Sequence, residues 1–155
     1  GWRAAQMGIN SYFVPNVVIF HAESYILKWN SKKFYWLERN RKYCLLTHFS
    51  KDTYKKMRLN LLLVDFLVWI FYISKGFIGA KIKAELDIKK NRKHIEDKYF
   101  ELENKKIIPD NELIKNFPDK IFVPVNVAKG NLNNIFNSIL EKLSKKAKAK
   151  IFQKT

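Results

Sequence analysis

The sequence is poor in cysteine and in acidic residues, and both shortages narrow what the protein can be. Its one cysteine, Cys44, excludes an internal disulfide framework and fits a reducing cytoplasmic setting. Only 14 Asp and Glu residues stand against 30 Lys and Arg, which leaves a formal net charge of +16. Such a charge favours an anionic partner, for example nucleic acid, phospholipid or a phosphorylated substrate.

The sequence also lacks the motifs that would direct this charge to nucleic acid. It has no zinc-finger spacing, no RNP-like aromatic motif and no Arg-rich recognition helix. The basic residues comprise 25 Lys and five Arg, whereas phosphate and base-edge recognition favours the planar Arg fork. The aromatic content of 15% permits base stacking. Nucleic-acid binding therefore stays an alternative that the sequence disfavours.

The first third of the chain predicts a short β segment and then a helix. From Tyr12 to Phe20 the residues are β-branched and aromatic with an interruption at Pro15, which predicts a strand, a turn and a second strand. A helix capped by Ser31 is predicted to follow, and Ser50 offers a break and a new cap. The predicted apolar face of this helix contains Phe34, Leu37, Cys44, Leu45 and His48, with Glu38, Arg39 and Lys42 more exposed.

The run from Leu59 to Ser74 is apolar apart from one charge, Asp65. It is shorter than the roughly 20 residues of a perpendicular membrane span, and a carboxylate near its centre costs about 3 kcal/mol by insertion scales. Basic residues flank both ends, so the positive-inside rule places both flanks in the cytoplasm. Arg58, Asp65 and Tyr72 recur every seven residues and form a narrow polar stripe. The pattern predicts a helix that lies in the membrane interface.

The remainder predicts three further helices. After a break at Lys75 and Gly76, one long charged helix is expected from Phe77 to about Asn104, then a short helix after Pro109. A connector from Phe117 to Val127 leads to an amphipathic helix capped by Asn131, interpreted as a membrane-surface helix because basic residues follow its apolar face. A partner-binding helix is the alternative. The narrow apolar face of the long helix, called its seam below, consists of Ile78, Ile82, Leu86, Ile95, Tyr99 and Leu102. The apolar face of the last helix consists of Leu132, Ile135, Phe136, Ile139, Leu140 and Leu143, and the basic residues that follow are Lys145, Lys146, Lys148 and Lys150.

The order of residues between Trp2 and Arg41 resembles the end of the catalytic domain in family 2 glycosyltransferases of the rhamnosyl and polysaccharide-building type. In that family an acidic pair precedes a bulky residue and Arg, a short helix ending in Gly, a strand with Pro and a His, and then a Tyr-rich helix with Arg-Asn-Arg. The matching residues here are Trp2, Arg3, Gly8, Tyr12, Pro15, His21, Ser24, Tyr35, Glu38, Arg39, Asn40 and Arg41. The resemblance covers roughly the first quarter of the chain.

This resemblance implies a GT-A fold that transfers a sugar, with inversion, from a nucleotide-sugar donor to a glycan or lipid-linked acceptor. The nucleotide-binding half, with its Asp-x-Asp motif, and the catalytic Asp base would both precede Gly1, so the chain alone is expected to be inactive. The implied cofactor is a divalent metal, Mn²⁺ or Mg²⁺, with His21 as a candidate ligand. Candidate substrate-binding residues are Trp2, Arg3, Lys33 and Arg39, which could stack on a sugar ring or contact phosphate.

Each candidate also has a purely structural alternative. His21 could be an ordinary residue at a strand end, Trp2 a buried Trp beside a structural Arg3, and the lysines a solvated helix face. Arg39 and Arg41 lie about 200° apart around a helix, so they cannot both serve one site. A non-enzymatic membrane-surface scaffold would explain the helices but not the ordered pattern from Trp2 to Arg41.

Together these patterns predict a mainly α chain in which a short β remnant of a GT-A α/β domain is followed by amphipathic, membrane-associating helices. Three parts are expected: residues 1–50 as the end of the catalytic domain, 51–106 as helices for membrane association, and 107–155 as a connector and basic helix. The expected partner is an anionic membrane surface at the cytoplasmic face, with peripheral or interfacial attachment. Since the sequence begins at Gly1 without a secretory signal pattern, we expect it to be a fragment.

Overall fold

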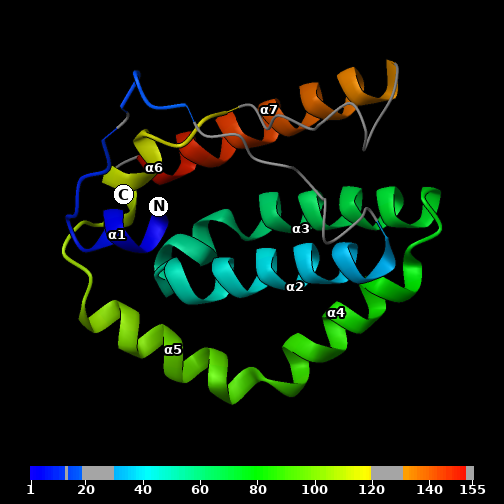
Figure 1. Cartoon of the computed structure of the whole chain (residues 1–155), viewed down its shortest axis with the longest axis horizontal. Helices are drawn as coiled ribbons and strands as arrows, with labels where there is room; N and C mark the ends of the chain where they lie inside the picture. The colour runs from blue at the N-terminus through cyan, green and yellow to red at the C-terminus, as the bar shows by residue number, and fades with distance from the viewer. Residues whose placement is uncertain (13, 19–29, 120–130, 153–155) are drawn as a thin grey trace. The chain divides into compact units, whose positions relative to one another are not determined.

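The structure is a computed structural model that describes residues 1–12, 14–18, 30–119 and 131–152. The described residues form helices and no strand, so the predicted mainly α fold is confirmed at that level (Figure 1). The helices are α1 (Trp2–Gln6), α2 (Ser31–His48), α3 (Lys51–Ser74), α4 (Ile78–Lys90), α5 (Arg92–Asn104), α6 (Asp110–Lys115) and α7 (Asn131–Phe152).

The predicted pair of strands is not seen in the described part of its segment. Residues 14–18 form a turn at Pro15, in which the Val17 amide donates to the Val14 carbonyl at 3.3 Å. A strand needs a neighbour to pair its backbone groups, and the described residues supply none for this segment. Residues 19–29, with His21 and Ser24, lie outside the described part of the chain.

The chain folds as two compact units, each of which we describe by itself. Unit 1 consists of residues 1–49 and 68–108, and unit 2 of residues 50–67 and 109–155. Helix α3 therefore begins in unit 2 and ends in unit 1. The three-part functional division at residues 50 and 106 stays a prediction.

Helix α2 is the central element of unit 1. The predicted helix forms, but its cap lies one residue earlier than the predicted Ser31. The cap is Asn30, whose side-chain oxygen accepts a hydrogen bond from the Lys33 amide at 3.0 Å. The predicted inner face is confirmed at Phe34 and His48, which are buried, and wrong at Leu37 and Cys44, which are exposed. Glu38, predicted to be more exposed, is buried. Residues four apart lie above one another on a helix, so Phe34 and Glu38 define one inward row.

The long helix predicted from Phe77 to Asn104 is divided at Asn91 into α4 and α5. The Asn91 side chain donates to both the carbonyl and the carboxylate of Asp87, at 2.9 and 2.7 Å. Such local side-chain bonds compete with the continuing helix. The bend lets both helices pack along α2 (Figure 1).

Small residues make the contact of α4 with α2. Ala80 and Ala84 are buried, whereas the seam predicted for this helix, Ile78, Ile82 and Leu86, is exposed. The α5 part of the predicted seam is confirmed at its two ends, where Ile95 and Leu102 are buried. The register of α4 is therefore set by close approach of alanines and not by its large apolar side chains.

Glycines end two of these helices. Gly8 follows α1 with φ 73°, and Gly76 follows α3 with φ 71°. Both angles lie in the left-handed region that glycine adopts without a Cβ penalty, the common way of ending a helix. The break predicted at Lys75 and Gly76 is thereby confirmed.

Unit 2 joins the start of α3 to α6 and α7. The Ser50 hydroxyl accepts from the Thr53 amide at 3.2 Å, which confirms Ser50 as the cap, and the Ser50 amide donates to the Asp110 carboxylate at 2.8 Å. The Asn60 side chain donates to the Leu143 carbonyl at 2.9 Å and so ties α3 to α7. The predicted short helix and last helix both form, and α7 extends through its basic residues to Phe152.

Packing at Ala84 gives a direct test of the α2–α4 contact. Ala84 has no exposed surface, so Ala84→Leu should overpack this contact and lower the free energy of unfolding by about 1–3 kcal/mol in chemical denaturation. Leu86→Ala, on the outer side of the same helix, should leave stability nearly unchanged. An Ala84→Leu protein as stable as the wild type would contradict the packing.

Candidate functional site

Trp2 and Arg3 lie at the C-terminal end of α2. The Trp2 ring packs against His48 and Phe49, with ring centroids 4.9 and 4.7 Å apart. Gln6, at the end of α1, donates from its side chain to the His48 carbonyl at 2.6 Å. These ring contacts fit the structural alternative for Trp2, although Trp2 is only half-buried and no ion pair of Arg3 is seen among the described residues.

Arg3 is exposed and makes no recorded ion pair within the described part of the chain. Its charge still reaches His48, because burial lowers the pKa of His48 and the nearby Arg3 lowers it further. His48 is accordingly a neutral packing residue, with its Nδ1 2.8 Å from the Thr47 hydroxyl. Of the two N-terminal candidates, Arg3 is the one that stays available to an anionic ligand.

Arg39 is engaged on the outer side of α2. Its guanidinium lies 3.9 Å from the centroid of the Trp36 ring and 3.8 Å from the Asp87 carboxylate. It also donates to the Asn40 side chain at 3.2 and 2.9 Å. Arg41 points elsewhere, to Glu38, so the prediction that the two arginines cannot share a site is confirmed.

The structure does not gather the sequence-predicted candidates into one site. Lys33 lies in the first turn of α2, half-buried, while Trp2 and Arg3 lie near His48 at the other end. At 1.5 Å per residue, Lys33 and His48 are about 22 Å apart along the helix axis. His21, the candidate metal ligand, lies outside the described residues.

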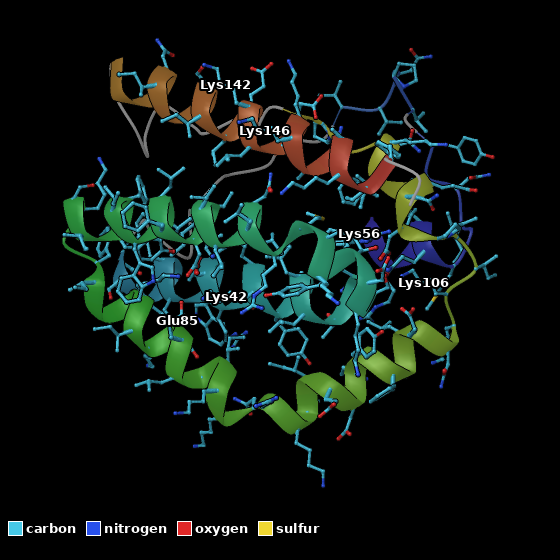
Figure 2. The ribbon with its side chains drawn as sticks, turned by 180° about the vertical axis from the view of Figure 1, so that it is seen from behind. Lys42, Lys56, Glu85, Lys106, Lys142 and Lys146 are labelled. Carbon is cyan, nitrogen blue, oxygen red and sulfur yellow. The ribbon has the colours of Figure 1, made fainter. Side chains whose placement is uncertain are left out.

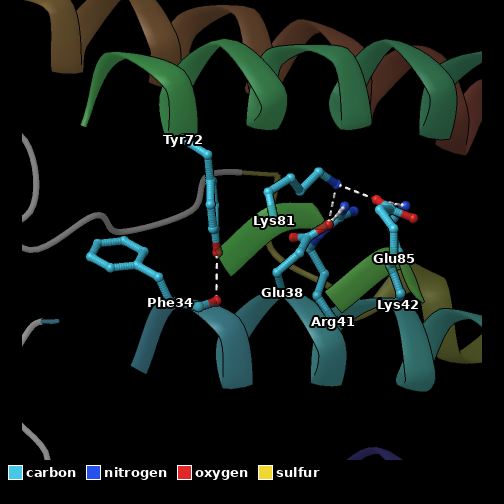
Figure 3. Close-up of polar contacts among 7 residues, drawn as sticks. All are labelled: Phe34, Glu38, Arg41, Lys42, Tyr72, Lys81 and Glu85. Carbon is cyan, nitrogen blue, oxygen red and sulfur yellow. Dashed lines mark hydrogen bonds and ion pairs between the residues drawn. The ribbon is translucent and has the colours of Figure 1, made fainter. Parts of the chain in front are cut away.

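Instead, unit 1 contains a buried ion network that the sequence did not predict (Figure 3). The Lys81 ammonium has no exposed surface and lies 2.5 Å from Glu38 Oε1 and 2.7 Å from Glu85 Oε1. Arg41 donates to both oxygens of Glu38, at 2.7 and 2.8 Å, and Lys42 donates to Glu85. Each carboxylate thus has two cationic partners, and the network joins α2 to α4.

The electrostatics of the network favour its ionised form. Burial raises the pKa of Glu85, but hydrogen bonds from Lys42 and Lys81 lower it more, so the pKa of this carboxyl lies below its ordinary value. With two cations on each carboxylate, the charges are balanced by the protein's own side chains. We therefore interpret the network as structural, since a metal ion would have to displace a lysine or arginine to bind here.

One signal for this network was present in the sequence. Glu38 follows Phe34 by four residues and so shares its inward row, and Lys81 and Glu85 are an i, i+4 pair on one helix. What could not be seen is the pairing of Glu38 with Lys81, which are 43 residues apart.

Helix α3 carries a second feature, an apolar face that points outward. Among the described residues it is the one helix long and apolar enough to cross a membrane. Its exposed large side chains fall within an arc of about 100° around the helix, and we call this arc the α3 outward face. The face consists of Leu59, Leu62, Leu63, Phe66, Ile70 and Ile73, which are 43–62% exposed.

The opposite half of α3 holds the three buried residues of this helix, among half-buried apolar ones such as Leu61, Val64 and Phe71. Thr53, Asn60 and Tyr72 are all buried there, and the Tyr72 hydroxyl donates to the Phe34 carbonyl at 2.8 Å (Figure 3). Burial raises the pKa of Tyr72, and the nearby Glu38 raises it further, so the hydroxyl keeps the proton that it donates. Tyr72, one of the three residues of the predicted polar stripe, thus faces inward.

Comparison with protein-family models, with curated proteins and with solved structures finds no match for this chain. The functional argument therefore depends on its own residues.

Because Lys81 is buried and Lys98 is exposed, we expect their replacement by Met to change the stability of the protein by different amounts. Lys81→Met leaves Glu38 and Glu85 each with one cation fewer, and the free energy of unfolding should fall by about 3 kcal/mol in urea denaturation at pH 7. Lys98→Met removes an exposed lysine that also lies 2.5 Å from a glutamate, Glu101, and should leave stability unchanged.

A pH series and a second variant complete this test. The pKa of Glu85 is lower in the folded than in the unfolded protein. The stabilisation by its carboxylate is therefore complete above the unfolded-state pKa and is lost as pH falls through the folded-state pKa. The difference in free energy of unfolding between wild type and Lys81→Met should accordingly become smaller below about pH 4. Glu38→Gln combined with Lys81→Met should recover part of the lost stability. A stability difference between wild type and Lys81→Met that does not depend on pH would contradict the network.

Proposed function

We propose that this chain is the membrane-docking, C-terminal part of an inverting family 2 glycosyltransferase. The whole enzyme would move a sugar from a nucleotide-sugar to a glycan or lipid-linked acceptor at the cytoplasmic face of the membrane, with Mn²⁺ or Mg²⁺ as cofactor. The chain by itself would be inactive, because the nucleotide-binding half and the catalytic base belong to the rest of the enzyme. The observation that carries the docking role is the α3 outward face.

The exposed apolar side of α3 supports a bilayer as its partner. A helix of a water-soluble domain exposes its polar side to water, whereas α3 buries Asn60 and Tyr72 and exposes six large apolar side chains on one face. Basic residues at both ends, Lys51 and Lys55 before the face and Lys75 after it, suit the anionic headgroups that border the hydrocarbon.

The internal bonds of α3 favour a helix lying in the interface. Its start is tied to α7 through Asn60, and its end is tied to α2 through Tyr72. If α3 crossed the bilayer, each bond would either break or draw a charged helix into the hydrocarbon, where unsatisfied polar groups cost several kcal/mol. Lying flat, α3 keeps both bonds and inserts only its outward face.

The strength of this docking is modest. Full burial of a Leu, Ile or Phe side chain contributes about 1.5–3 kcal/mol, and roughly half of each side chain on the face is exposed, so all six offer on the order of 5 kcal/mol. That corresponds to weak, reversible membrane binding, which needs a second contribution to become stable.

The transferase assignment is supported by the ordered residues between Trp2 and Arg41. Helix α1 is short and is followed by Gly8 at positive φ, as in the family's short helix ending in Gly. The exposed side chains of Tyr12, Val14, Val17 and Val18 would have a partner in the whole enzyme, where this segment would complete the GT-A sheet. In this proposal His21 binds the metal and Arg3 contacts phosphate.

Membrane docking is tested by co-sedimentation with phosphatidylcholine vesicles. Leu62→Gln combined with Phe66→Gln removes the centre of the α3 outward face, and binding should weaken at least about tenfold because exposed apolar area is lost. The matched control is Ile78→Gln with Leu86→Gln, which changes two equally exposed apolar residues of α4 and should bind as the wild type does. Equal loss in both variants, or no binding by the wild type, would refute docking through α3.

The transferase part is tested in the product of the whole gene that encodes this chain. His21→Ala should lower metal-dependent sugar transfer on the order of 100-fold, because a metal ligand is lost. His94→Ala, at an exposed histidine of α5, should have no effect. A gene product without a nucleotide-sugar-binding half, or without any transfer activity, would rule the assignment out.

A further inference from the structure

The exposed face of α7 changes in character along its length. Five exposed residues fall within an arc of about 80°, and the first two are isoleucines while the last three are lysines. We call this arc the α7 outward face; it consists of Ile135, Ile139, Lys142, Lys146 and Lys150. The opposite side of the helix is buried in unit 2 at Leu140 and Ala147. The predicted apolar face is thus divided, with Leu140 inward and Ile135 and Ile139 outward.

The lysines of α7 fall into two groups by their partners. Lys145 pairs with Glu141 at 2.7 Å, and Lys148 pairs with Asp119 at 2.9 Å. No ion pair is recorded within the described residues for the three lysines of the outward face, two of which Figure 2 labels on the helix. These three recur every fourth residue, so they form a row with a spacing of about 6 Å. The unbalanced positive charge of α7 is concentrated in this row.

We propose that the α7 outward face binds the headgroup phosphates of anionic phospholipids, with Lys142, Lys146 and Lys150 as the residues that contact them. This inference rests on the proposed membrane docking and adds to it a site that selects the lipid. The two isoleucines can enter the apolar layer, while each lysine lays its aliphatic stem along the surface and keeps its ammonium at headgroup depth.

The chemistry of the face favours lipid over nucleic acid. Binding of single-stranded nucleic acid combines cations with aromatic rings on which the bases stack, and the described residues of this face include no aromatic side chain. Its cations are lysines, compact point charges without the bidentate fork of arginine. Such charges suit the headgroup layer of an anionic membrane, whose phosphates can be contacted without a fixed geometry.

The α3 and α7 outward faces would then respond to different properties of the bilayer. The α3 outward face is apolar, so it contributes equally to binding of neutral and anionic bilayers. The lysines of the α7 outward face contribute only when the lipid is charged. A lysine near an anionic surface strengthens binding by about fivefold, and three of them by about 100-fold together.

The experiment compares vesicles of phosphatidylcholine alone with vesicles that also contain phosphatidylserine. The test variant combines Lys142→Gln, Lys146→Gln and Lys150→Gln, changes that keep helix propensity high. The control combines Lys89→Gln, Lys90→Gln and Lys93→Gln, three exposed lysines around the α4–α5 break, and so has the same net charge. Circular dichroism checks that both variants keep their helix content.

The α7 variant should lose about 100-fold in affinity for the phosphatidylserine vesicles and nothing for phosphatidylcholine, while the control loses much less. Equal losses in the two variants would show that net charge alone is sensed and would overturn the proposal. Equal binding of the wild type to both kinds of vesicle would also overturn the proposal for α7, although the proposed docking through α3 would still hold. Loss of binding to a single-stranded oligonucleotide, with vesicle binding intact, would assign the face to nucleic acid instead. A wild type that binds neither vesicle would refute the proposed docking itself.

Discussion

The buried ammonium of Lys81 is the interaction on which unit 1 depends. It has no exposed surface and lies between the carboxylates of Glu38 and Glu85, so α4 must stay close to α2 to keep the three charges paired. Ala80 and Ala84 permit this approach because they are small. Removing one of the partners would leave the others buried with an unbalanced charge, which costs far more than the loss of an exposed ion pair.

The position of the end of α3 is fixed next to the same ion network. Tyr72, in the last turn of that helix, donates a hydrogen bond to the Phe34 carbonyl, one turn before Glu38. This bond fixes the register of the end of α3 on α2 beside the ion network. Once Tyr72 faces inward, the 3.6-residue period directs Phe66, Ile70 and Ile73 outward. The apolar surface that we propose as the docking face thus follows from polar contacts made on the other side of the helix.

A protein that joins a membrane in this way needs more than apolar area. The α3 outward face offers on the order of 5 kcal/mol, little beyond what a single lipid chain provides. The unpaired charge of the chain supplies a second contribution, and α7 presents part of it as one row. In the proposed docking, these two weak contributions would make attachment reversible and dependent on the lipid, as would suit an enzyme that works on membrane-bound acceptors.

Local patterns in the sequence determined the positions of most helices. Ser50, Gly76 and Pro109 act within a few residues of themselves, and the breaks predicted from them are all present. The break at Asn91 was missed, because nothing in composition distinguishes a polar residue that ends a helix from one that merely faces solvent. The strand pair was predicted from β propensity, which depends on having a neighbouring strand.

The charge, the apolar run and the ordered residues from which the transferase proposal comes are all visible in the sequence. The direction in which each helix faces depends on its tertiary contacts. Leu37 and Glu38 are neighbours on α2, and the apolar one is exposed while the charged one is buried. The physical reason is that Glu38 gains a buried partner in Lys81, 43 residues away, and helical periodicity contains no information about such a partner.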